Sequence, residues 1–198
     1  MDIVSWTLDN PSYDVNRPVS GHKKATLSRT NGNKIFIDAH EPSQSISASQ
    51  ARQYVRRLIA GLRAAGMQRG DTVCILTLSS VSQLPFSLCK CTHKAQIYYP
   101  VLFLAIVGAG GRVAGGNPGH TVYELQHLLS KCSVKFIVTE ISLLSKTASA
   151  ASECGIDPSR IYLCNGHNTS SADPQSWCNL LQHGECGWDV LDLSLIHI

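Results

Sequence analysis

The sequence predicts an α/β protein in which helices alternate with mostly parallel strands. Between Ile46 and Cys164, apolar residues at helical spacing alternate with short β-branched runs. Because each expected strand is followed by an expected helix, right-handed crossovers would make the strands parallel. The composition agrees, since 43% hydrophobic and 16% charged residues are typical of a globular chain of 198 residues.

The expected elements follow from local signals. Ser47 with Gln50, and Thr121 with Glu124, have the spacing of capping boxes that begin helices. Gly66 suits the end of the first helix. The expected strands are Ile35–Ile37, Thr72–Leu76, a short strand after the glycine-rich turn at 108–111, Val134–Val138 and Ile161–Cys164. The expected helices run from Ser47 to Ala65, from Pro100 to Val107, from Thr121 to about Leu129, from Ile141 to Ser152 and, as a short one, from Trp177 to His183.

Two segments interrupt this order. Gly21–Lys34 is basic and polar, and Thr77–Gln96 is neither helical nor alternating, although it separates a strand from its helix. We therefore divide the chain into an N-terminal arm with an insertion (residues 1–34), a patterned α/β region with a second insertion (35–164, insertion 77–96) and a poorly patterned, truncated C-terminal segment (165–198). The first 20 residues show no periodicity and are expected to be extended.

Charge and hydrophobicity exclude several classes of partner. The 17 Lys and Arg residues are scattered and the net charge is +3, so no nucleic-acid partner is expected. The apolar run Ile97–Ala109 is about 13 residues, against roughly 20 for a bilayer span, so no membrane span is expected. The opening MDIVSWTLDN lacks a secretory pattern, which predicts an intracellular protein. Its widely spaced cysteines are then expected to be reduced, mostly buried thiols: Cys74, Cys132, Cys154 and Cys164.

A cluster of glycines could cradle a nucleotide phosphate with its backbone N–H groups. The cluster comprises Gly108, Gly110, Gly111, Gly115 and Gly116. A Rossmann fingerprint would need glycine in place of Val113 and would follow a strand, whereas this cluster follows a helix. A P-loop would need lysine and a hydroxyl residue where Asn117 and Pro118 stand. The pattern therefore favours tight turns and close packing, and a small nucleotide-binding protein is only a third, weaker reading.

Other candidate site residues also fail their tests. Cys89, Cys91 and His93 do not have the spacing of a zinc site. Asn168, Thr169 and Ser170 match a glycosylation acceptor, which an intracellular protein would not use. Glu124 is explained by its capping box, and His120 and His127 are expected to have surface or packing roles.

Two blocks of sequence resemble a known family. They are SISASQARQYVRRLIAGLRAAGMQRGDTVCI and YYPVLFLAIVGAGGRVAGGNPGHTVYELQHLLSKCSVKFIVTE. They are similar to the N-terminal region of the adenylate-forming (AMP-binding) superfamily, and within it to fungal acyl-CoA synthetases of the 4-coumarate–CoA ligase type. The resemblance covers Ile35–Leu76 and Tyr98–Leu163. It implies an incomplete N-terminal subdomain of the adenylate-forming fold. We hypothesise that the two insertions are gene-model errors.

The resemblance implies an ATP-dependent, AMP-forming acid–CoA ligase as the parent enzyme, with ATP, Mg²⁺ and CoA as cofactors and a carboxylic acid as substrate. In that family the phosphate loop, a Thr-Glu segment, a ribose-binding Asp and a C-terminal Lys carry the chemistry, and none has a counterpart here. We therefore assign no catalytic, cofactor-binding or metal residues and expect an inactive fragment, cytoplasmic or peroxisomal in location. The alternative is a non-catalytic α/β binding or regulatory module derived from that family.

Overall fold

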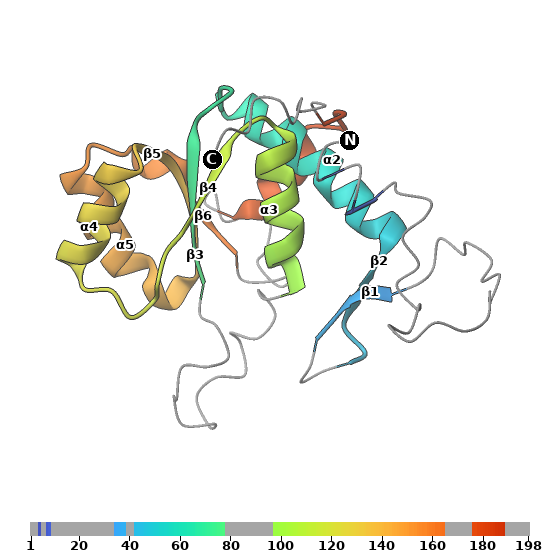
Figure 1. Cartoon of the computed structure of the whole chain (residues 1–198), viewed down its shortest axis with the longest axis horizontal. Helices are drawn as coiled ribbons and strands as arrows, with labels where there is room; N and C mark the ends of the chain where they lie inside the picture. Colours follow the sequence, from blue (N-terminus) through green and yellow to red (C-terminus); the bar gives the residue numbers. More distant parts are fainter. Residues whose placement is uncertain are drawn as a thin grey trace, which may run out of the picture.

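A parallel four-stranded sheet forms the centre of the computed structural model, which describes residues 4, 7–8, 34–38, 42–77, 97–164 and 176–188 (Figure 1). Its strands are β3 (Thr72–Leu76), β4 (Arg112–Gly115), β5 (Val134–Thr139) and β6 (Ile161–Leu163). They lie in the order β4-β3-β5-β6 and every neighbouring pair is parallel. The predicted α/β class, its parallel strands and their sequence order are confirmed.

Helices cover both faces of this sheet. On one face lie α2 (Ala48–Ala64) and α3 (Tyr99–Gly108), and on the other lie α4 (Val122–Lys131) and α5 (Leu144–Glu153) (Figure 1). Alternate residues of β3 serve the two layers: Val73 and Ile75 pack with the first pair of helices, and Cys74 and Leu76 with the second. Burial on both faces explains why β3 is apolar throughout apart from its first residue.

The predicted helix signals at the start and end of α2 are confirmed. The Ser47 side chain accepts a hydrogen bond from the Gln50 N–H at 3.3 Å, and the Gln50 side chain accepts one from the Ser47 N–H at 2.8 Å. After the helix, Gly66 adopts a φ of 88°, a conformation that glycine reaches without steric cost.

Two expected helices have a different form. The segment expected to be one helix from Ile141 begins as a 3₁₀ turn, η2 (Ile141–Leu143), and only then continues as α5. The short helix expected at Trp177 is also a 3₁₀ helix, η5 (Trp177–Gln182). A third 3₁₀ turn, η3 (Pro158–Arg160), precedes β6. Apolar spacing alone does not separate these tight turns from α-helix, because both place residues three apart on one side.

A small antiparallel ribbon precedes α2. The expected first strand is present as β1 (Lys34–Ile37), but it pairs with β2 (Ser45–Ser47), a segment that the sequence suggested was loop and helix start. Strand β2 was not predicted because its three residues are too few to show the alternation of a strand, and only Ile46 among them is buried.

The prediction of an extended N-terminal arm is wrong at the positions that the structure describes. Val4, Thr7 and Leu8 are helical, and Val4 and Leu8 are buried in the core formed with α2 and α3. The proposed insertions at 21–34 and 77–96 lie outside the described residues, apart from Lys34 and Thr77.

Residues 176–188 pack along α2, which the weak pattern after Asn165 did not indicate. Trp177 and Leu180 of η5 are buried. The Cys186 N–H donates to the Arg56 carbonyl at 3.1 Å, and the Arg56 guanidinium lies 5.4 Å from the Trp188 ring centre. In the part of the chain that the structure describes, no helix is long and apolar enough to cross a bilayer.

Candidate functional site

The carboxyl edge of the sheet is the first place to search for a site. Ligands of open α/β sheets bind outside the carboxyl ends of the strands, where successive connections diverge. Here the connection through α3 leads from β3 outward to its neighbour β4. The connection that follows β5 leads in the opposite direction along the sheet, to β6. The divergence therefore falls between the carboxyl ends of β3 and β5, at Leu76 and Thr139.

Buried polar side chains lie where β5 ends. Thr139 and Thr147 are fully buried, and their hydroxyl oxygens are 3.3 Å apart. The Thr147 hydroxyl donates to the Leu143 carbonyl at 2.8 Å, so the Thr139 hydroxyl is the donor between the two. Glu140 is 3% exposed, and its carbonyl accepts from the Leu143 N–H. These groups join β5 to the start of α5, and the two threonine hydroxyls are used within the fold.

The glycines of the cluster have structural roles: Gly110 and Gly111 lie in the turn before β4, at the amino edge of the sheet, and Gly116 follows the carboxyl end of β4. The N–H groups of Gly110, Gly111 and Gly116 donate to the carbonyls of Val107, Ile106 and Ile75, so they are not available to a phosphate. Gly110 has a φ of 86°, which a turn between helix and strand requires.

Close packing fills the space beside two of these glycines. A Cβ on Gly111 would lie 2.0 Å from the Met67 side chain, and one on Gly116 would lie 2.6 Å from Leu76. A phosphate of ATP therefore has neither free N–H donors nor room at these positions. The arrangement matches the tight turns and close packing predicted from the spacing, and it does not fit a nucleotide cradle.

The loop from Asn117 to Thr121 follows the glycines and is held by hydrogen bonds within the loop and from α5. The Asn117 side chain accepts from the Gly119 N–H at 2.9 Å, and the His120 N–H donates to the Asn117 carbonyl at 3.0 Å. From α5, the Lys146 ammonium donates to the carbonyls of Pro118 and His120, the latter at 2.8 Å. Sequence reasoning did not single out Lys146, because nothing local pairs it with a loop 26 residues away.

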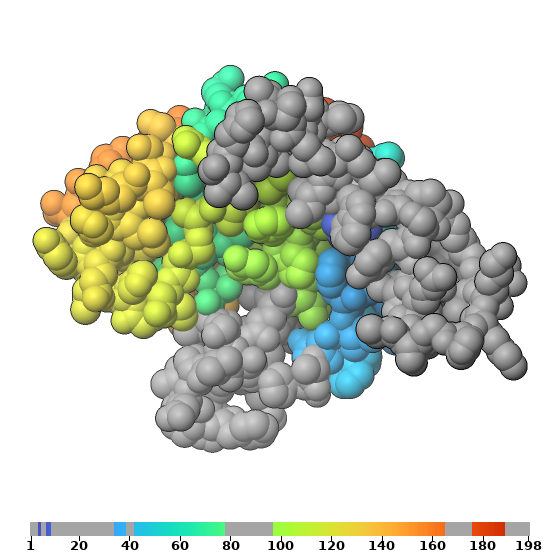
Figure 2. Space-filling model, in the orientation of Figure 1, coloured from blue at the N-terminus to red at the C-terminus, as the bar shows by residue number. Residues whose placement is uncertain are grey.

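Glu124, His120 and His127, which the sequence analysis considered as catalytic residues, do not form a catalytic group. The Thr121 N–H and hydroxyl both donate to the Glu124 carboxylate, at 2.8 and 2.9 Å, which confirms the predicted capping box. His120 Nδ1 is buried without a hydrogen-bond partner among the described residues, whereas His127 is exposed on α4, whose region lies at the surface in Figure 2. The structure does not bring the three together around a shared reacting position.

The capping box predicts how stability depends on pH. Hydrogen bonds from the Thr121 backbone and side chain lower the pKa of the Glu124 carboxyl, and His120 adds to this. A lowered folded-state pKa contributes stability above the ordinary carboxyl pKa, and this contribution is lost as pH falls through the folded value. In urea unfolding, Glu124→Gln should be less stable than the parent at pH 7, and the difference should shrink at pH 3. An equal difference at both values would contradict this account.

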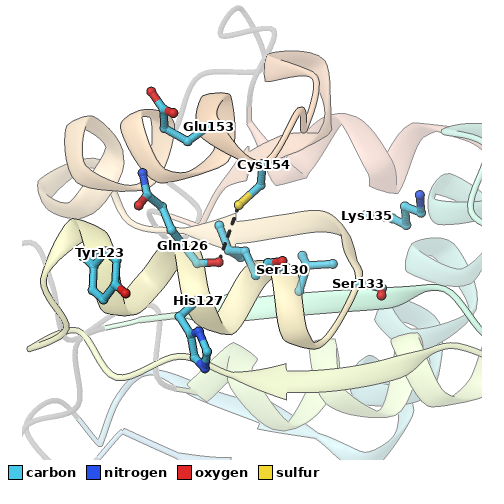
Figure 3. Close-up of a pocket in the computed structure, with 10 residues that line it drawn as sticks. Tyr123, Gln126, His127, Ser130, Ser133, Lys135, Glu153 and Cys154 are labelled. Atoms are coloured by element: carbon cyan, nitrogen blue, oxygen red, sulfur yellow. Dashed lines mark hydrogen bonds between the residues drawn. The ribbon is translucent and has the colours of Figure 1, made fainter.

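A shallow depression of about 690 Å³ lies between α4 and the end of α5 (Figure 3). Its polar rim includes Gln126, His127, Lys135 and Glu153, and the Cys154 thiol contacts the Gln126 carbonyl at 3.6 Å. Burial and the nearby Glu153 raise the pKa of Cys154, so its thiol stays protonated and is a poor nucleophile. No pair of nucleophile and base forms in this depression.

The cysteines of the described regions are free thiols, as predicted. Cys74 and Cys164 are buried, whereas Cys132 and Cys154 are partly buried. Burial, with a contribution from Cys132, raises the pKa of Cys74 to about 12, which makes it inert at neutral pH. Within residues 34–38, 42–77, 97–164 and 176–188, no three His, Cys, Asp or Glu side chains form a metal-binding group. The weighed candidates Cys89, Cys91, His93 and Asn168–Ser170 lie outside the described residues.

Comparison with known proteins relates the chain to acid–CoA ligases. It is 34% identical over 194 residues to the acyl-CoA ligase azaF of Aspergillus niger, with 96% of this chain and 30% of the ligase covered. The phenylacetyl-CoA ligase epaB of Aspergillus niger matches with the same identity and coverage. The chain thus spans about a third of the length of these relatives. No protein-family model matches the sequence.

Solved structures show the same fold. A benzoate CoA ligase from Burkholderia xenovorans superposes with a TM-score of 0.59 at 15% identity, over 79% of this chain and 26% of the ligase. At this identity the likeness concerns the fold alone, and it covers part of a domain. Sequence relatives and fold together relate this chain to the N-terminal region of the adenylate-forming superfamily, with fungal acyl-CoA ligases as its relatives.

Proposed function

We propose that this chain is a scaffold portion of an acid–CoA ligase and that it does not form an acyl-adenylate by itself. The observation that carries this proposal is coverage: nearly the whole chain matches its relatives, yet it matches only 30% of their length. The remaining length of a ligase is then the source of the catalytic groups. The described residues supply the sheet and helices on which those groups would be held.

The carboxyl edge supports the same proposal. The Gly116 N–H at this edge donates to the Ile75 carbonyl, and the Lys146 ammonium is directed at two loop carbonyls. These two groups are therefore used within the fold and are not available to the phosphates of ATP. No step of adenylation or thioester formation is assigned to them.

The complete enzyme would join a carboxylic acid to CoA at the expense of ATP, with Mg²⁺. We propose an aromatic acid as its substrate, because a phenylacetyl-CoA ligase is among the relatives. That reaction needs donors or a metal ion to stabilise the charge that develops on the phosphate. In this proposal those groups come from the polypeptide outside the matched region.

Exchange of labelled pyrophosphate into ATP tests the proposal, because it reports adenylate formation without CoA. The chain should give only background exchange with benzoate, phenylacetate and a fatty acid. The intact Aspergillus niger acyl-CoA ligase, assayed with the same acids, is the positive control. Acid-dependent exchange by the chain alone would overturn the proposal. Saturable binding of ATP, CoA or an acid without exchange would instead favour a binding or regulatory module.

A further inference from the structure

Two segments of the sequence share an unusual layout. The first runs from Val19 to Lys34 and the second from Val81 to Gln96. Both contain sixteen residues, both begin with Val-Ser, and both have a threonine at the twelfth position. The two segments are identical at these three positions only, so they do not have the pattern of a structural repeat. Equal length and equal ends in otherwise unlike segments call for a cause outside the fold.

The shared positions are those at which codons can carry the signals of an intron. Introns begin with GT, most often as GTAAGT or GTGAGT, and both of these openings are translated as Val-Ser. Introns end with AG, and the closing residues Lys34 and Gln96 have the codons AAG and CAG. The threonine codon ACT, followed by AAC for Asn31 or CAC for His93, contains the CTNAC form of the branch site that precedes the end of an intron. The relatives of this chain are fungal, and fungal genes contain short introns.

The fold needs no long connection between β3 and α3. Twenty-two residues lie between Leu76 and Tyr99, whereas strand-to-helix connections in α/β proteins have about 2–6 residues. Because α3 is about as long as β3 and ends beside its amino end, α3 begins at the level of Leu76. Without residues 81–96, six residues remain, and they reach about 20 Å, more than the roughly 10 Å between packed layers. Leu76 and Ile97 are both buried, so the core continues on each side of the segment.

The ribbon before α2 is irregular where the first segment ends. Strand β1 begins at Lys34, the last residue of that segment, and its register with β2 shifts between Lys34 and Phe36. Ile35 and Phe36, which follow the segment, pack against the core. Without residues 19–34, Pro18 would precede Ile35 and take the first position of the strand, where proline is tolerated.

We propose that residues 19–34 and 81–96 are the translation of two unspliced introns, and that the mature protein lacks both. These limits replace the insertion limits predicted from patterning alone, 21–34 and 77–96, and they do not depend on the proposed function. Together the two segments carry six Lys and Arg residues and no Asp or Glu, so their removal changes the formal net charge from +3 to −3. The mature protein would also lack the Cys-x-Cys-x-His sequence of the second segment, which was considered as a metal site.

The gene and its message test this proposal codon by codon. In genomic DNA, Lys34 should be encoded by AAG and Gln96 by CAG, and each opening valine codon should be GTA or GTG followed by AGT. The codon AAA for Lys34 or CAA for Gln96 would remove the terminal AG and overturn the proposal. In sequenced messenger RNA, the codon before each segment should join the codon after it, so that sixteen codons are lost at each place. Message that keeps both segments in every read, or that joins at other codons, would also overturn it.

Thermal unfolding of a shortened chain provides a second test. A variant without residues 19–34 and 81–96 should melt at a temperature at least as high as the parent, because shorter connections cost less closure entropy. The matched control lacks residues 19–34 and 85–100, which removes the same number of residues but includes the buried Ile97 and Tyr98 and the start of α3. That control should melt at a lower temperature than the parent. A lower melting temperature for the first variant would mean that the segments belong to the fold, whatever the pyrophosphate assay shows, and would overturn the proposal.

Discussion

Replacing Gly61 by alanine should detach the C-terminal segment from α2. A Cβ on Gly61 would lie 2.1 Å from the carbonyl oxygen of Leu180 and 2.6 Å from its Cα. These are backbone atoms of η5, so no side-chain rotation can relieve the overlap. Either η5 moves away or α2 shifts against α3. We expect Gly61→Ala to lower the free energy of unfolding by about 3 kcal/mol.

Urea unfolding followed by tryptophan fluorescence measures this effect, because Trp177 and Trp188 both lie in the segment concerned. Gly187→Ala is the matched control, since it adds the same methyl group to the same segment where no atom lies within 4 Å. We expect that control to change stability by no more than about 0.5 kcal/mol. Equal effects of the two substitutions would show that η5 does not pack on Gly61.

The contrast between these glycines shows where sequence reasoning stops. Gly66 could be assigned from its place after a helical pattern, because a left-handed conformation at a helix end is a local requirement. Gly61 lies inside the same helical pattern, and its spacing does not reveal that a backbone 119 residues later touches it. Capping boxes and buried strands were predictable because their causes lie within a few residues or in burial on both faces of the sheet.

The candidate site also has features that the sequence predicts and features that only the structure reveals. Spacing alone was enough to reject the two phosphate motifs, because each requires particular residues at particular positions. The physical reason that the glycines are needed emerged only from the structure, where Met67 and Leu76 fill the space beside Gly111 and Gly116. The bond from Lys146 to the Asn-Pro loop likewise joins two elements that no local pattern connects.

Truncating Trp177 should have the largest effect of a single side chain. Its indole is fully buried, with the Tyr98 ring centre at 5.1 Å, and it belongs to the core that α2 and α3 share. Trp177→Ala would remove that packing and leave a cavity, because η5 is held against α2 and cannot collapse into the space. We expect a loss of about 3–5 kcal/mol in unfolding free energy, measured in urea.

Trp177→Phe separates packing from hydrogen bonding. The Trp177 Nε1 is buried and has no hydrogen-bond partner within the described part of the chain, so its N–H carries a desolvation cost without a compensating bond. Phenylalanine removes that cost and keeps most of the aromatic contact, although it leaves a smaller gap. The substitution should therefore change stability by less than about 1.5 kcal/mol. A loss as large as that of Trp177→Ala would mean that the indole N–H has a partner in solution and that it contributes to holding η5 on α2.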